Sequence, residues 1–177
     1  MAQTLELLNA AAIQFAVNRI AHEIAERNHD HGEIVLLGIP NGGNHFAQRL
    51  ATALAGIRPT PPPVGTLDIT MHRDDLDTRA LPDVHPSHIP VDLTGKTVVL
   101  VDDVIFSGRT ARAALDALND LGRPRRVQLV ALIDRGHREL PIAPDFVGKS
   151  VSTAATERIE VRWKEAAGID QVELLKP

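Results

Sequence analysis

Two spacings of apolar residues alternate along this chain. Between Asn9, whose side chain can cap a helix, and about Asn28, apolar residues recur at helical spacing at Ile13, Val17, Ile20 and Ile24. A continuous apolar run, Ile34–Gly38, is typical of a buried parallel strand. A second helical spacing then runs through Phe46, Leu50 and Leu54. The chain is therefore predicted to begin as a helix, a strand and a helix.

The same alternation continues to the end of the chain. Another helix is predicted at Thr110–Leu121, with Leu115 among its buried residues, ended by Gly122 and Pro124. Further strands are predicted at Val64–Thr70, Thr97–Val101, Val127–Ile133, Phe146–Val151, Ile159–Trp163 and Gln171–Leu175. Strands that alternate with helices predict an α/β fold with a mainly parallel sheet and right-handed crossovers.

One segment, Met71–Pro90, has no periodic apolar face and holds three prolines, Pro82, Pro86 and Pro90. A long irregular loop in a compact domain is usually functional or disordered. We therefore expect this segment to lie beside a functional site or to be disordered.

Composition indicates the class of protein and the cellular compartment. Its 177 residues favour one domain, residues 1–177, and 44% hydrophobic with 24% charged residues is the balance of a globular protein. There is no cysteine, which excludes disulfides and thiolate metal sites and favours a cytoplasmic protein. We find neither a signal peptide nor a membrane-spanning apolar run. A net charge of -4 and 3% aromatic residues argue against a general nucleic-acid binder, although a local basic face stays possible.

The strongest chemical signal follows the predicted strand Thr97–Val101. It is the run Val101-Asp102-Asp103-Val104-Ile105-Phe106-Ser107-Gly108-Arg109-Thr110, which leads into a helix. Ligands of open parallel sheets bind beyond the carboxyl ends of the strands, and the N–H groups at a helix start suit a phosphate. The two carboxylates would repel a phosphate, so they should meet vicinal hydroxyls or a metal ion. An ordinary turn and helix cap is the alternative, but the whole run favours a site for a ribose 5-phosphate.

This run resembles the phosphoribosyl pyrophosphate (PRPP) signature of type I phosphoribosyltransferases, and the whole chain resembles the PyrR family. The segments that carry the resemblance are 18–23, 64–70, 73–76 and the octapeptide Asp134-Arg135-Gly136-His137-Arg138-Glu139-Leu140-Pro141. The resemblance implies a type I phosphoribosyltransferase fold with a central sheet, a small hood and a flexible loop. It also implies the reaction of uracil with PRPP to give UMP and pyrophosphate, and regulation of pyrimidine genes through their leader RNA.

The resemblance assigns roles to particular residues. It implies that Asp102 and Asp103 hold the ribose hydroxyls, and that Mg²⁺ is bound mainly through PRPP, with this pair as candidate ligands. Ser107–Thr110 would hold the 5-phosphate, and Arg73 would neutralise pyrophosphate from the closing loop. The full set expected to bind PRPP or UMP is Asp102, Asp103, Val104, Ile105, Phe106, Ser107, Gly108, Arg109, Thr110, Asn41, Gly42 and Arg135.

Two positions depart from the family pattern. After the first strand of the sheet the family usually has Thr-Arg-Gly, in a loop that contacts pyrophosphate. This chain has Asn41-Gly42-Gly43 there, which we call the pyrophosphate loop. Backbone N–H groups can still bind an anion there, but the missing arginine predicts weakened turnover. Where many phosphoribosyltransferases place an acidic residue beside the phosphate loop, this chain has Phe106, which cannot transfer a proton.

The resemblance also implies a basic face for RNA, formed by Arg19, His22, Arg27, His137, Arg138 and Lys149. Arg19 and Arg27 flank Glu23 at spacings of four residues, which is equally typical of a solvated helix face. We further expect a homo-oligomer. Two other functions stay open: a UMP- or PRPP-sensing RNA-binding regulator with little catalysis, and a phosphoribosyltransferase for another base without an RNA role.

Overall fold

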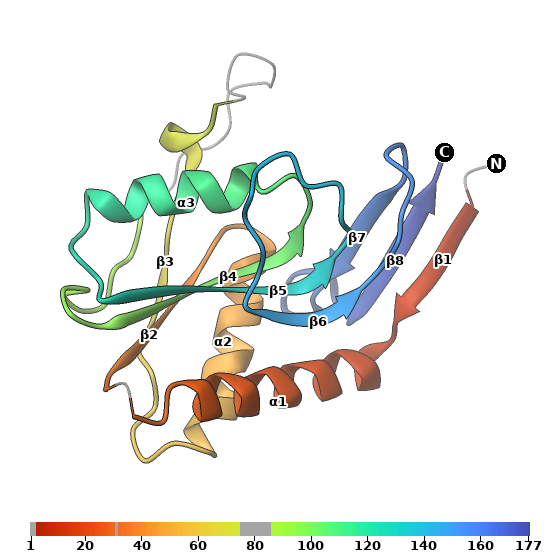
Figure 1. The fold of residues 1–177 in the computed structure, drawn as a ribbon. Helices are drawn as coiled ribbons and strands as arrows, with labels where there is room; N and C mark the ends of the chain where they lie inside the picture. The colour runs from red at the N-terminus through yellow and green to blue at the C-terminus, as the bar shows by residue number, and fades with distance from the viewer. Residues whose placement is uncertain (1–2, 31, 75–85) are drawn as a thin grey trace.

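The protein is built from two sheets of different kinds (Figure 1). A computed structural model describes residues 3–30, 32–74 and 86–177. Five parallel strands form one sheet in the order β3-β2-β4-β5-β6, and three antiparallel strands form the other in the order β1-β8-β7. The elements are β1 Gln3–Leu8, α1 Ala10–Arg27, β2 Ile34–Gly38, α2 Gly42–Ala55, β3 Val64–Thr66, a 3-10 turn Thr70–His72, β4 Thr97–Ile105, α3 Arg109–Asn119, β5 Arg126–Asp134, β6 Phe146–Ser150, β7 Arg158–Arg162, α4 Lys164–Ala167 and β8 Gln171–Lys176.

Helices cover both faces of the parallel sheet. Helices α1 and α2 lie on one face and α3 on the other (Figure 1). Alternate residues of β4 follow this division: Val99 and Val101 pack with α1 and α2, whereas Val98 and Leu100 pack with α3. The expected α/β fold with a parallel central sheet is confirmed.

The antiparallel sheet lies beyond the carboxyl ends of β5 and β6, in the place expected of a hood (Figure 1). Arg49 of α2 ties this sheet to the main body. Its guanidinium hydrogen-bonds the carboxylates of Glu165 and Asp170 at 2.6–3.0 Å and lies 4.8 Å from the centre of the Trp163 ring. Phe46 stacks on the same ring at 5.6 Å. The position of the hood is therefore set from helix α2.

Helix α1 and strand β2 form as the sequence predicts. The side chain of Asn9 accepts a hydrogen bond from the Ala12 N–H at 2.9 Å, so it caps α1. Strand β2 spans the predicted residues, and its burial is continuous.

Three predicted boundaries are wrong by more than one residue. Strand β3 stops at Thr66, although the predicted alternation of burial continues to Thr70, because its partner β2 ends at Gly38. Strand β4 runs on to Ile105 rather than ending at Val101. Helix α3 ends at Asn119, before Gly122, and Leu115 is 39% exposed rather than buried. Residues 75–85 of the expected irregular loop lie outside the described residues.

No helix in the described ranges combines the length and apolar character needed to cross a membrane.

Candidate active site

The turn between β4 and α3 has the geometry of an anion site. It comprises residues 106–108, and Gly108 adopts φ 91°, a left-handed conformation that favours glycine. Helix α3 starts at Arg109, so its first N–H groups and the positive end of its dipole face this turn. The Ser107 hydroxyl adds a further polar group and lies 3.4 Å from the Arg109 N–H. We call residues 106–110 the phosphate loop.

A cavity of about 440 Å³ opens beside the phosphate loop. Most of the residues predicted to bind PRPP line it together. They are Arg73, Asp102, Val104, Ile105, Phe106, Ser107, Gly108, Arg109 and Thr110, joined by Ala111 and Glu139. Asp103, Asn41, Gly42 and Arg135 do not line this cavity.

The sequence suggested that Asp102 and Asp103 follow the end of a strand. The structure instead places both residues within β4. Asp102 still pairs with Ala131 of β5, so the strand continues through the acidic pair. Because neighbouring residues of a strand point to opposite faces, Asp102 lines the phosphate cavity while Asp103 faces the start of α2. The pair thus presents one carboxylate to each side of the strand end.

The surroundings of Asp102 and Asp103 raise the pKa of both carboxyl groups. Burial raises the pKa of Asp102 well above its ordinary value, and the charge of Asp103 raises it further, while Arg73 acts in the opposite direction. Burial also raises the pKa of Asp103, against hydrogen bonds from Asp102 and from the Val104 N–H that lower it. Asp102 therefore holds a proton more strongly than Asp103 does. A cation or hydroxyl groups bound at the pair would displace it.

The start of α2, which follows a cis peptide bond between Pro40 and Asn41, approaches Asp103 without a side chain between them. A Cβ built on Gly42 would lie 1.9 Å from Oδ2 of Asp103, and one built on Gly43 would lie 2.2 Å from the Val101 carbonyl oxygen. These approaches place the loop that the resemblance assigns to pyrophosphate directly against the second carboxylate. It supplies backbone groups with no cation.

Comparisons with known proteins agree with this geometry. The profile of the family described as "Phosphoribosyl transferase domain" matches residues 3–166. The "Bifunctional protein PyrR" of Chloroflexus aurantiacus is 55% identical, covering 99% of this chain and 97% of the relative. The protein of that name from Thermus thermophilus is 54% identical, covering 96% and 94%. The chain belongs to the PyrR family of phosphoribosyltransferases.

Solved structures show the same fold outside the PyrR family. The hypoxanthine phosphoribosyltransferase of Trypanosoma cruzi superposes with a TM-score of 0.73 at 19% identity, covering 97% of this chain and 96% of that chain. A hypoxanthine phosphoribosyltransferase from Staphylococcus aureus gives 0.72 at 18% identity, covering 98% and 93%. The fold is therefore the type I phosphoribosyltransferase fold expected from the sequence.

Two residues of the expected irregular loop, Arg73 and Asp74, form hydrogen bonds with the phosphate loop. Arg73 donates a hydrogen bond to the Thr110 hydroxyl at 3.1 Å. Asp74 accepts from Arg109 at 2.7 Å and from Arg112 at 3.0 Å. The docked Arg73 therefore adds a second guanidinium to the cavity that Arg109 also lines.

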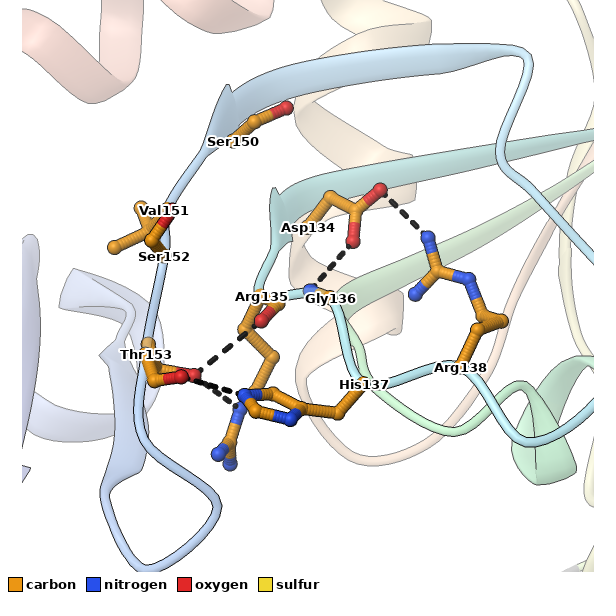
Figure 2. Close-up of a pocket in the computed structure, with 9 residues that line it drawn as sticks. All are labelled: Asp134, Arg135, Gly136, His137, Arg138, Ser150, Val151, Ser152 and Thr153. Atoms are coloured by element: carbon orange, nitrogen blue, oxygen red, sulfur yellow. Dashed lines mark hydrogen bonds and ion pairs between the residues drawn. The ribbon is translucent and has the colours of Figure 1, made fainter.

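Arg135 packs against the Phe106 ring and does not line the cavity beside the phosphate loop. Its guanidinium sits 4.1 Å from the centre of the Phe106 ring, and it hydrogen-bonds the Thr153 hydroxyl and the Ala154 carbonyl. It lines a second cavity, of about 410 Å³, between the loops that follow β5 and β6 (Figure 2). Burial lowers the pKa of Arg135, although a guanidinium stays charged. Arg135 therefore packs against the Phe106 ring and helps to hold it in position.

The residues expected to bind RNA lie along α1, β6 and the loop after β5. Arg19 donates to the carbonyls of Val147 and Gly148 in β6, and Lys149 donates to the Leu7 carbonyl. Three further members are also bonded within the protein: Arg27 pairs with Asp145, His137 contacts the Thr153 carbonyl, and Arg138 pairs with Asp134. His22 is exposed and lines a surface cavity with Glu26, His29 and Arg58. Most of this basic face is thus tied by internal bonds.

Sequence reasoning missed several residues around the site. Glu139 and Asp74 hold Arg109 from two sides. Arg49 and its two acidic partners fix the hood. These pairs join positions far apart in the chain, so no local pattern signals them.

Proposed function

We propose that this protein transfers the phosphoribosyl group of PRPP to uracil, giving UMP and pyrophosphate, and that it also binds leader RNA to regulate pyrimidine genes. The observation that carries the proposal is the phosphate loop beside Asp102 and Asp103 in a chain that matches PyrR proteins over almost its whole length. Fold likeness alone would not choose the base, because the solved neighbours act on hypoxanthine by their names.

The 5-phosphate of PRPP would bind in the phosphate loop. The N–H groups at the start of α3 and the hydroxyls of Ser107 and Thr110 supply hydrogen bonds to its oxygens. Arg109 is oriented by Asp74 and Glu139, which keeps a guanidinium at the same end of the cavity. Together these groups hold one end of the substrate.

The ribose would extend from this loop toward the acidic pair. Carboxylate oxygens accept hydrogen bonds from vicinal hydroxyls and are ligands that Mg²⁺ prefers. The described residues contain no group of three or more His, Cys, Asp or Glu side chains that could hold a metal, and we expect the cation to be bound mainly through PRPP. When bound, Mg²⁺ neutralises charge on the pyrophosphate. The protein's own part is to fix the ribose between Asp102 and Asp103.

Positioning and electrostatic stabilisation would then supply most of the catalysis. The departing pyrophosphate meets backbone N–H groups of the loop at Asn41–Gly43 and, from the docked segment, Arg73. Phe106 stands 38% exposed at the edge of the cavity and offers an apolar ring to the base. Uracil must lose its N1 proton on transfer, and its own acidity lets this proton pass to solvent without a carboxylate base at the position of Phe106.

RNA binding would use the face formed by α1, β6 and the loop after β5. Arg19, Arg27 and Lys149 approach the same edge strand, β6, from α1 and from the strand itself. These groups keep exposed surface: the side chains of Arg19 and Arg27 are 48% and 50% exposed. Their cations remain able to contact phosphates while bonded to the protein.

The deciding experiment is a turnover assay with PRPP, Mg²⁺ and a panel of bases, followed by titration of a pyrimidine leader hairpin. Turnover with uracil and saturable binding of the hairpin would support both activities. Hairpin binding without turnover would favour the sensing regulator, for which the loop Asn41-Gly42-Gly43 is the motivating feature. Turnover with another base and no hairpin binding would leave only an enzyme.

A further inference from the structure

The three consecutive residues Arg138, Glu139 and Leu140 hydrogen-bond to the backbone of the phosphate loop. The Arg138 guanidinium donates to the Phe106 carbonyl at 2.8 Å. The N–H groups of Glu139 and Leu140 donate to the Ser107 carbonyl at 2.9 and 3.1 Å. The carbonyls of Phe106 and Ser107 are therefore both engaged by one segment of the chain.

This engagement matters because a carbonyl oxygen carries partial negative charge. A carbonyl turned toward the cavity would repel a phosphate dianion, whereas an N–H turned there would bind it. Holding the Phe106 and Ser107 carbonyls outward keeps the turn in the orientation in which its N–H groups face the anion. The left-handed Gly108 allows this orientation but does not enforce it.

The side chain of Arg138 is itself held in place. Asp134 accepts from Arg138 at 2.7 Å and is fixed in turn by the Gly136 N–H at 3.0 Å (Figure 2). The Arg138 side chain is only 23% exposed, and its Cδ lies 3.6 Å from a Cβ built on Gly108. Arg138 thus packs against the phosphate loop along its stem and binds it through its guanidinium.

We propose that Arg138 is a positioning residue for PRPP, which fixes the Phe106 carbonyl so that the phosphate loop presents its donors to the 5-phosphate. This proposal rests on the proposed phosphoribosyl transfer, and it assigns to Arg138 a role within the enzyme that RNA binding does not require. The backbone bonds from Glu139 and Leu140 survive any change of the Arg138 side chain, so the fold of the turn should persist while its orientation loosens.

The test compares Arg138→Gln and Arg138→Lys with the wild-type protein and with Arg123→Gln. Arg123 is exposed in the turn before β5, at the opposite end of the sheet, so its change removes one cation at a distance from the site. KM for PRPP, KM for uracil and kcat are measured for each, together with thermal unfolding. Binding of PRPP with Mg²⁺ is measured separately by calorimetry.

Loss of a charged hydrogen bond is expected to raise KM for PRPP about tenfold in Arg138→Gln. KM for uracil and kcat should change much less, because Arg138 contacts Phe106 through its backbone carbonyl and not through the ring that is proposed to face the base. Arg138→Lys, which keeps one donor, should fall between Arg138→Gln and wild type, and Arg123→Gln should match wild type. A purely structural role would instead lower the unfolding temperature without separating the two KM values.

Unchanged KM and calorimetric affinity for PRPP in Arg138→Gln would overturn the proposal. If that variant does not fold, Arg138→Lys decides by the same two measurements, and wild-type values in it would likewise overturn the proposal. A wild-type protein that neither binds nor turns over PRPP would instead refute the proposed function. The two failures are therefore distinguishable.

Discussion

Replacing Gly42 by alanine tests whether the close approach of α2 to Asp103 matters for catalysis. The new Cβ would lie 1.9 Å from Oδ2 and 2.5 Å from Cγ of Asp103, far inside an ordinary contact. Either the carboxylate or the loop must move by more than about 1 Å, and a displacement of about 1 Å at a reacting group can lower the rate about 100-fold. We therefore expect kcat/KM for PRPP to fall about 100-fold, equivalent to about 2.7 kcal/mol of transition-state stabilisation.

Stability should respond differently from activity. Gly42 is the first residue of α2, and alanine favours a helix over glycine, which offsets part of the strain in the loop. The matched control is Gly56→Ala at the other end of the same helix, where φ is -81° and a new Cβ would lie 3.5 Å from the Ala53 carbonyl oxygen, an ordinary contact. Initial rates over a range of PRPP concentrations, with thermal unfolding of both variants, provide the measurement. A Gly42→Ala protein with kcat/KM within twofold of wild type would refute the reasoning.

Three further changes test other parts of the structure. Asp102→Asn should abolish Mg²⁺-dependent PRPP binding in calorimetry, yet it should raise the unfolding temperature at neutral pH. The reason is that the pKa of Asp102 is raised in the folded state, so the ionised aspartate destabilises the fold at neutral pH. This gain in unfolding temperature should disappear at low pH, where the aspartate of the wild-type protein is protonated in both the folded and the unfolded state. Arg49→Met should lower the free energy of unfolding by about 3 kcal/mol in denaturant titrations, because it removes the ion-pair partner of Asp170, whose side chain is only 15% exposed. The control Arg162→Met, on the surface of β7, should lower the free energy of unfolding much less. Lys149→Ala should weaken binding of a pyrimidine leader hairpin and reduce the slope of log affinity against log salt concentration by roughly 0.7–0.9. Lys96→Ala, which removes a lysine at the amino end of β4, should leave both the affinity and the slope unchanged. Equal slopes for the two variants would count against the RNA face.

The parts of the fold that depend on local signals could be predicted from the sequence. Helix α1 has a capping side chain and a continuous apolar stripe, and β2 is apolar throughout. The phosphate loop could be predicted as well, because a buried strand, a glycine and a helix start follow one another in the chain. Each of these signals lies within about ten residues of the structure that it predicts.

The boundaries that failed depend on neighbouring strands. Aspartate is a poor strand former, so Asp102 and Asp103 suggested a strand end; pairing of Asp102 and Val104 with β5 carries β4 past them. In β3, the alternating burial was predicted, but the hydrogen-bonded ladder ends where β2 ends. Strand ends are set by partners that the sequence pattern does not show.

The roles of the basic residues were the hardest to predict. An arginine in a sequence can be a solvated charge, an RNA contact or an internal bond, and spacing does not separate these. Arg138 was expected to contact RNA, and the structure places it on the Phe106 carbonyl and Asp134. Arg19 was expected on the same face and donates to two carbonyls of β6. Only the positions of the acceptors reveal these bonds, and the acceptors lie up to 129 residues away.

The pairing of β1 with β8 gives the hood an unusual place in the order of synthesis. Gln3 pairs with Lys176, so β1 must wait for the synthesis of β8 before their ladder can close. The parallel sheet and the phosphate loop, by contrast, are complete once β6 has been made at Ser150. On a ribosome, the phosphate site can therefore assemble while the hood is still missing, and an unpaired β1 would present its open edge to neighbouring chains. Closure of the hood is the step that ends this exposure.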